Sequence, residues 1–204
     1  MMLRPDFTQD LAHLPTTAFG HRSLPWWGVV AFMMIEGAAF ALAFAAYFFL
    51  MSQEASWPPE PIPPPDLLLP TLFLLPVLLS ELPNIVLKRA AEGLNLERVQ
   101  ALLVVMSTIG GIVLVLRGFE LALLNVSWTA NAYGSIVWAL LVIHTVHVLT
   151  DWADTLVLTA LMFTKHGREP RRFSDVSDNA LYWHFVVLTW VPVYALIYWA
   201  PRIV

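Results

Sequence analysis

The chain alternates between long apolar runs and short polar connections, and five of the apolar runs are long enough to cross a bilayer. A helix rises about 1.5 Å per residue, so about 20 residues span the ~30 Å hydrocarbon core. The runs that meet this length are residues 26–51, 67–87, 99–124, 133–163 and 179–200. The pattern predicts an all-α integral membrane bundle of five transmembrane helices.

The composition supports a membrane protein. Hydrophobic residues make up 58% of the 204 residues and charged residues 13%, and the mean hydropathy is +0.68, which is too apolar for a soluble domain. We expect an N-terminal segment over residues 1–25, without the apolar core of a signal peptide, and a single membrane domain over residues 26–204. The chain contains no cysteine, which excludes disulfides and thiolate metal sites.

Lysine and arginine collect on alternate sides of the predicted spans. Nine of them lie before the first span, between the second and third, or between the fourth and fifth: Arg4, Arg22, Lys88, Arg89, Arg98, Lys165, Arg168, Arg171 and Arg172. The connections 52–66 and 125–132 contain none. The positive-inside rule therefore predicts a cytoplasmic N-terminus and a C-terminus outside.

The fourth apolar run contains a stripe of ionisable residues. At ~100° per residue, His144, His147, Asp151 and Asp154 share one helix face. Because lipid offers these side chains no partner, they must face protein or water. An interhelical hydrogen-bond network accounts for them; a metal site or a haem would need further donors from a second helix, such as His184.

Ionisable residues also occur in the other spans. Glu36 lies ~16 Å into the first span, where it either fixes helix packing or relays protons. Glu81 lies near the cytoplasmic end of the second, where snorkelling to the interface explains it. Arg117 and Glu120, three residues apart, can form a structural pair. The residues predicted to form a buried polar network or to support proton uptake are Glu36, His144, His147, Asp151, Asp154 and His184.

Five segments, taken in order, resemble subunit III of the haem-copper terminal oxidases in its five-helix bacterial form. They are the first span with Glu36, Trp57-Pro58-Pro59, Arg117-Gly118-Phe119-Glu120, His144-Thr145-Val146-His147-Val148 and Tyr182-Trp183-His184-Phe185. Arg117 departs from the glutamine of the family, and Asp151 stands where the family usually has glycine.

The resemblance implies an accessory subunit of a proton-pumping cytochrome c oxidase that reduces dioxygen to water. It further implies no catalytic residue and no redox centre in this chain, with haem and copper in a partner catalytic subunit. The chain would support proton uptake and the stability of that subunit in a bacterial inner membrane. Its partners would be the other oxidase subunits and membrane phospholipid, which the chain could bind. Nucleic acid would not be a partner.

Three alternatives stay open from the sequence. The first is the related small subunit of a nitric oxide reductase complex. The second is a membrane b-type cytochrome that uses His144, His147 and His184 as haem ligands. The third is a small transporter or proton channel built around Glu36 and Asp151, which is less favoured because the chain has no inverted repeat.

Overall fold

The computed structural model describes residues 18–203, and these residues contain helices and no β-strand. The elements are η1 (Gly20–Arg22), α1 (Leu24–Gln53), α2 (Leu68–Leu79), α3 (Glu81–Glu92), α4 (Leu96–Ala122), α5 (Ala132–Met162), η2 (Lys165–Arg168), α6 (Pro170–Tyr194), η3 (Ala195–Trp199) and α7 (Ala200–Ile203). Five stretches of the described chain are long and apolar enough to cross a membrane: Leu24–Gln53, Leu68–Glu92, Leu96–Ala122, Ala132–Met162 and Pro170–Ile203. The all-α class and the five spans are therefore confirmed.

The second span consists of two helices, α2 and α3, that meet at Ser80. Pro83 has no N–H to donate to the carbonyl of Leu79, the last residue of α2, so the helical ladder is weakened at this point. The Ser80 hydroxyl donates to the carbonyl of Val77 at 2.6 Å and accepts from the indole of Trp183 on α6 at 2.8 Å. Contacts with a neighbouring helix thus support the proline-rich segment, as a helix break inside a membrane requires.

The last span begins earlier than the apolar pattern predicts. We expected it to start at residue 179, whereas α6 starts at Pro170, a favourable first residue for a helix. The first turns of α6 are polar but largely buried: Ser174, Ser177 and Asp178 are each less than 5% exposed. A count of apolar residues misses this segment, because its polar side chains pack against protein.

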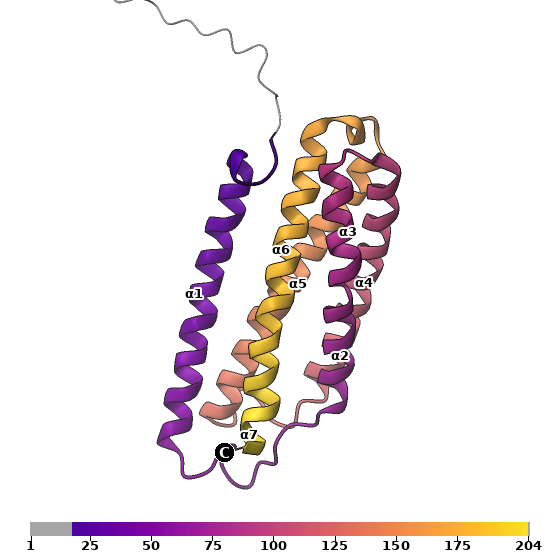
Figure 1. Cartoon of the computed structure of the whole chain (residues 1–204). Helices are drawn as coiled ribbons and strands as arrows, with labels where there is room; N and C mark the ends of the chain where they lie inside the picture. Colours follow the sequence, from indigo (N-terminus) through magenta and orange to yellow (C-terminus); the bar gives the residue numbers. More distant parts are fainter. Residues whose placement is uncertain (1–17, 204) are drawn as a thin grey trace, which may run out of the picture.

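Figure 1 shows α3, α4, α5 and α6 as a packed group, with α1 at one edge of the molecule. Helix α1 contacts α5 and α6 and buries only Phe40 and Tyr47. The start of α1, the α3–α4 connection and η2 all lie at the upper end of the view in Figure 1. We call this end the basic end.

The basic end groups most of the lysine and arginine residues of the described chain. They are Arg22, Lys88, Arg89, Arg98, Lys165, Arg168, Arg171 and Arg172. Arg4 lies outside the described residues. The opposite end, with the 54–67 and 123–131 connections, has only Arg202. The fold thus places the predicted cytoplasmic connections together, and the assignment of this end to the cytoplasm stays a prediction.

Candidate functional site

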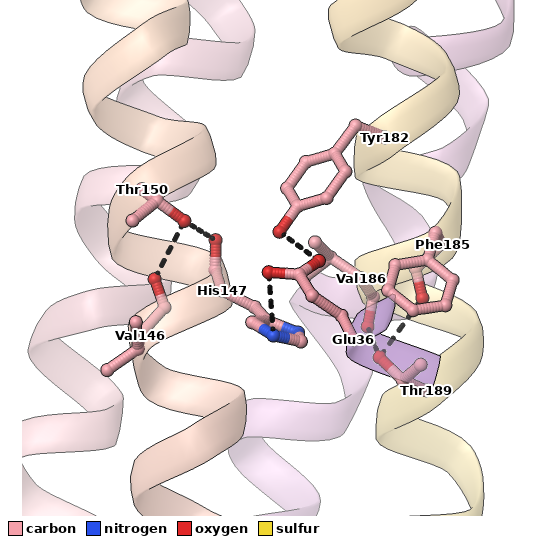
Figure 2. Close-up of polar contacts among 8 residues, drawn as sticks. All are labelled: Glu36, Val146, His147, Thr150, Tyr182, Phe185, Val186 and Thr189. Carbon is pink, nitrogen blue, oxygen red and sulfur yellow. Dashed lines mark hydrogen bonds and ion pairs between the residues drawn. The ribbon is translucent and has the colours of Figure 1, made fainter. Parts of the chain in front are cut away.

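Glu36 stands at the centre of a three-helix cluster, drawn in Figure 2. Its Oε1 lies 3.0 Å from Nε2 of His147 on α5, and its Oε2 accepts a hydrogen bond of 2.7 Å from the hydroxyl of Tyr182 on α6. The side chains of His147 and Glu36 are only 6% and 13% exposed. Both carboxylate oxygens therefore have a partner, and each partner comes from a different helix.

Aromatic rings surround this Glu36 cluster. The ring of Phe40 packs edge-on against His147 with centroids 4.9 Å apart, and Phe185 lies 6.1 Å from the same imidazole. Phe32 packs against Tyr182 at 5.8 Å. Because these rings exclude water from one side of the cluster, the hydrogen bonds to Glu36 are stronger than they would be in solvent.

The two aspartates of the α5 stripe are held by an α6 residue that our sequence analysis did not identify. The amide of Asn179 donates to Asp151 Oδ1 and to Asp154 Oδ2, both at 3.2 Å. The hydroxyl of Thr155 donates in turn to the Asn179 carbonyl oxygen at 3.2 Å. Asn179 thus links the buried carboxyl group of Asp151 to the carboxyl group of Asp154, which is exposed.

A cavity of about 610 Å³ lies beside these groups, between the beginnings of α1 and α6 and the second half of α5. Asp151, Asp154 and Tyr182 all line it, so the residue that donates to Glu36 also faces the cavity. Oδ2 of Asp151 accepts no hydrogen bond from residues 18–203, although Asp151 is only 2% exposed. Since liquid water occupies ~30 Å³ per molecule, the cavity has room for several waters.

A second cluster, around Arg117, lies in the core nearer the opposite end. Arg117 Nη1 donates to Glu120 Oε2 at 2.7 Å, and Nη2 donates to His144 Nδ1 at 3.1 Å. Glu120 Oε1 accepts from the hydroxyl of Tyr198. The guanidinium lies over the rings of Phe73 and Trp190, 3.8 and 4.1 Å from their centroids. The expected Arg117 and Glu120 pair is therefore embedded in a larger aromatic and polar cluster.

His144 is locked in this cluster as a neutral ring. Arginine can only donate, so Nδ1 of His144 must accept the bond from Arg117 and must lack a proton. Nε2 then carries the proton and donates it to the Val186 carbonyl, 3.0 Å away. Both ring nitrogens are engaged, and His144 is fully buried. The ring has no free nitrogen with which to bind a haem or a metal.

His184 lies apart from the other predicted residues. Its side chain is 59% exposed on the outside of the bundle, with Nδ1 2.8 Å from Glu81 Oε2. Our expectation of one internal network is therefore replaced by four separate groups: Glu36 with His147, Asp151 with Asp154, His144 with Arg117, and His184 with Glu81. Within residues 18–203, no group of three or more histidines, aspartates and glutamates could hold a metal ion.

These features define a multi-pass helical membrane protein whose ionisable side chains are paired with one another across helices. A family model for cytochrome c oxidase subunit III matches residues 12–201. The chain is 29% identical over 184 residues to cytochrome c oxidase subunit 3 of Synechocystis, covering 88% of this chain and 77% of the relative. It is 24% identical over 183 residues to the same subunit of Thermostichus vulcanus (86% and 87%) and 27% identical over 181 residues to that of Lumbricus terrestris (85% and 69%).

The chain therefore belongs to the cytochrome c oxidase subunit III family. As a member of this family it is part of a multi-subunit oxidoreductase complex. This confirms the resemblance noted in the sequence. It does not favour the nitric oxide reductase subunit or the b-type cytochrome that the sequence left open.

Proposed function

We propose that the chain is an accessory subunit of a proton-pumping haem-copper oxidase that reduces dioxygen to water, and that it performs no bond-making step itself. It would lie beside the catalytic subunit that holds haem and copper, in a bacterial inner membrane with the basic end in the cytoplasm. Family membership supports the complex. The location of the relatives in cyanobacteria supports the bacterial membrane.

The contact between the cavity and the Glu36 cluster is the observation that supports a role in proton uptake. The cavity lies at the basic end and reaches Tyr182, whose hydroxyl donates to Glu36. Glu36 would take up the hydroxyl proton of Tyr182 while a water in the cavity returns a proton to the phenol oxygen. That water would regain its proton from a hydronium ion at the basic end, so that the phenol and the water stay neutral and one proton is taken up. Asp151 and Asp154, which line the same cavity, would collect protons where it opens at the basic end. In this proposal the chain holds and passes protons near the catalytic subunit.

Membrane phospholipid is the second proposed partner. Helix α1 buries only two of its residues, so most of its surface must contact lipid or another subunit. The basic connections at one end of the bundle suit anionic head groups. Lipid contact would then be set by the exposed face of α1 and by the charge of the basic end.

Purification of the tagged chain from its native membrane in mild detergent tests the accessory role. We expect a haem-copper catalytic subunit to come with the chain, and we expect the haem spectrum to leave with that partner when the complex is dissociated. If the isolated chain kept a Soret band that disappears in His184→Ala, it would itself be a cytochrome and the proposal would be wrong. If the chain came without any oxidase subunit, the proposed complex would be wrong.

A further inference from the structure

Two hydroxyl groups from different helices meet at the inner end of the large cavity. On α1, α5 and α6, the cavity-lining residues farthest from the basic end are Phe32, Thr150 and Tyr182. Figure 2 shows the hydroxyl oxygens of Thr150 and Tyr182 between α5 and α6. Thr150 is exposed, so a small molecule in the cavity can reach its side chain. Our sequence analysis gave no role to this threonine.

The hydrogens of both hydroxyl groups are already used inside the protein. The Thr150 hydroxyl donates to the carbonyls of Val146 and His147 in its own helix, at 2.9 and 3.1 Å. The Tyr182 hydroxyl donates to Glu36 Oε2 at 2.7 Å. A hydroxyl group has one hydrogen to donate and two lone pairs with which to accept. Toward the cavity, each of the two oxygens can therefore only accept a hydrogen bond.

The other polar groups that line the cavity do not supply a donor to these two oxygens. The side-chain nitrogen of Asn179 has two hydrogens, and they bond to Asp151 and Asp154. Arg172 also lines the cavity, but it lies ten residues before Tyr182 on α6, about 15 Å along the helix. Among the described residues, the inner end of the cavity thus presents acceptors that need a donor from a bound molecule.

We propose that Thr150 and Tyr182 together hold one water molecule, which delivers protons to Glu36. A water molecule has two hydrogens and can donate one to each of the two oxygens. A buried water typically makes about three hydrogen bonds, and a neighbouring water in the cavity supplies the third. The inference rests on the proposed function and deepens it, because it names the residue that positions the water beside Tyr182.

The two acceptors fix the direction in which this water points, and the direction determines the proton transfer. The water passes a hydrogen to the Tyr182 oxygen while the phenol passes its own proton to the carboxylate of Glu36. The water oxygen then gains a proton from a hydronium ion farther along the cavity, which becomes water. The phenol and the held water are unchanged, and Glu36 has gained one proton. Thr150 takes up no proton itself, so it is a positioning residue.

Thr150→Val tests the inference, because valine keeps the branched shape of threonine but has no oxygen. Thr145→Val is the matched control: Thr145 lies on the same helix and also donates to a carbonyl of that helix, that of Leu141 at 2.6 Å, but it does not line the cavity. The rate of proton uptake by the oxidase complex is measured during turnover in vesicles. We expect Thr150→Val to be about fivefold slower than the parent complex, the effect of losing one hydrogen bond. Thr145→Val should keep the parent rate, and Thr150→Ser, which restores the hydroxyl, should recover it.

The double variant Thr150→Val with Tyr182→Phe shows whether Thr150 acts through Tyr182. If the two residues hold the same water, Thr150→Val should not slow proton uptake further once Tyr182→Phe is present. Independent effects of the two changes would overturn the inference, as would equal slowing by Thr145→Val.

The single variants separate this inference from the proposed function. If Tyr182→Phe slows proton uptake and Thr150→Val does not, the proposed function stands and the water site is wrong. If neither change slows proton uptake, the proposed role of the Glu36 cluster is wrong, and the water site is wrong with it.

Discussion

The Glu36 cluster and the Arg117 cluster contain the same three kinds of side chain, a glutamate, a histidine and a tyrosine, but the cavity beside the Arg117 cluster, lined by Glu120 and Tyr198, is only about 70 Å³. Around Arg117 both Nη atoms, both carboxylate oxygens of Glu120 and both nitrogens of His144 bond to protein, whereas the buried Nε of Arg117 has no acceptor among the described residues. Aromatic rings cover the group. Around Glu36 the donor Tyr182 also lines a cavity of about 610 Å³. In the proposed function, the Arg117 cluster fixes the helices, whereas the Glu36 cluster exchanges protons with water in its larger cavity.

The largest expected effect on stability comes from breaking the Arg117 cluster. Arg117→Leu leaves the carboxylate of Glu120 buried without its cation, and loss of one partner of a buried pair typically costs about 3–5 kcal/mol. We expect this loss in the free energy of unfolding, measured in detergent by denaturant titration. The variant Arg117→Gln, which carries the residue usual in the family, should lose less because its amide can still donate to Glu120.

The double variant Arg117→Leu with Glu120→Leu serves as the control for this prediction. Removing both charges avoids an unpaired buried carboxylate, so we expect the double variant to recover part of the lost stability. Equal stability of Arg117→Leu and the parent chain would show that the Arg117 cluster does not fix the helices.

A smaller effect is expected from the residue that joins the two aspartates. Asn179→Leu removes the donor to Asp151 and Asp154 and leaves the buried Oδ1 of Asp151 without a hydrogen bond, which costs about 1–3 kcal/mol. Thr108→Val is the control, since Thr108 is exposed and bonds only within its own helix. Thermal unfolding in detergent should separate the two variants; identical melting temperatures would contradict the assignment of Asn179.

The smallest effect on stability is expected from removing the hydroxyl group of either of two tyrosines of α6. Tyr182→Phe removes the bond to Glu36, and Tyr194→Phe removes a bond of 2.8 Å to Thr71 that lies away from the cavity. Each change should cost about 1 kcal/mol of unfolding free energy. If the two variants lose the same stability, a difference between them in proton transfer can be attributed to the contact of Tyr182 with the cavity. A loss of several kcal/mol in Tyr182→Phe alone would instead assign the Glu36 cluster to packing.

The sequence predicts the fold well because run length alone determines how many helices can cross a bilayer. It misses the start of α6 because buried Ser174 and Ser177 do not register as apolar. It predicts that the α5 stripe faces protein, since the stripe is periodic. The sequence cannot give the hydrogen-bond partners of these acids, because Asn179 and Tyr182 belong to another helix, α6, whose rotation about its axis does not follow from the sequence.

The position of His184 illustrates the same limit. Counting residues gives its depth but not the direction in which it points. The structure turns Trp183, Val186 and Trp190 of α6 inward, so His184 faces outward and pairs with Glu81 instead of His147. The buried face of a helix can be predicted from its sequence only where polar residues mark the opposite face. Because α6 is apolar on several sides, its buried face cannot be predicted in this way.

The most direct test of the account is the rate of proton uptake by the purified oxidase complex during turnover in vesicles, compared among Tyr182→Phe, Glu36→Gln and Tyr194→Phe. We predict that the first two variants take up protons several-fold more slowly than the parent complex at alkaline pH, where protons are scarce, and that Tyr194→Phe does not. Equal rates in all three variants would contradict a role for the Glu36 cluster and its cavity in proton uptake.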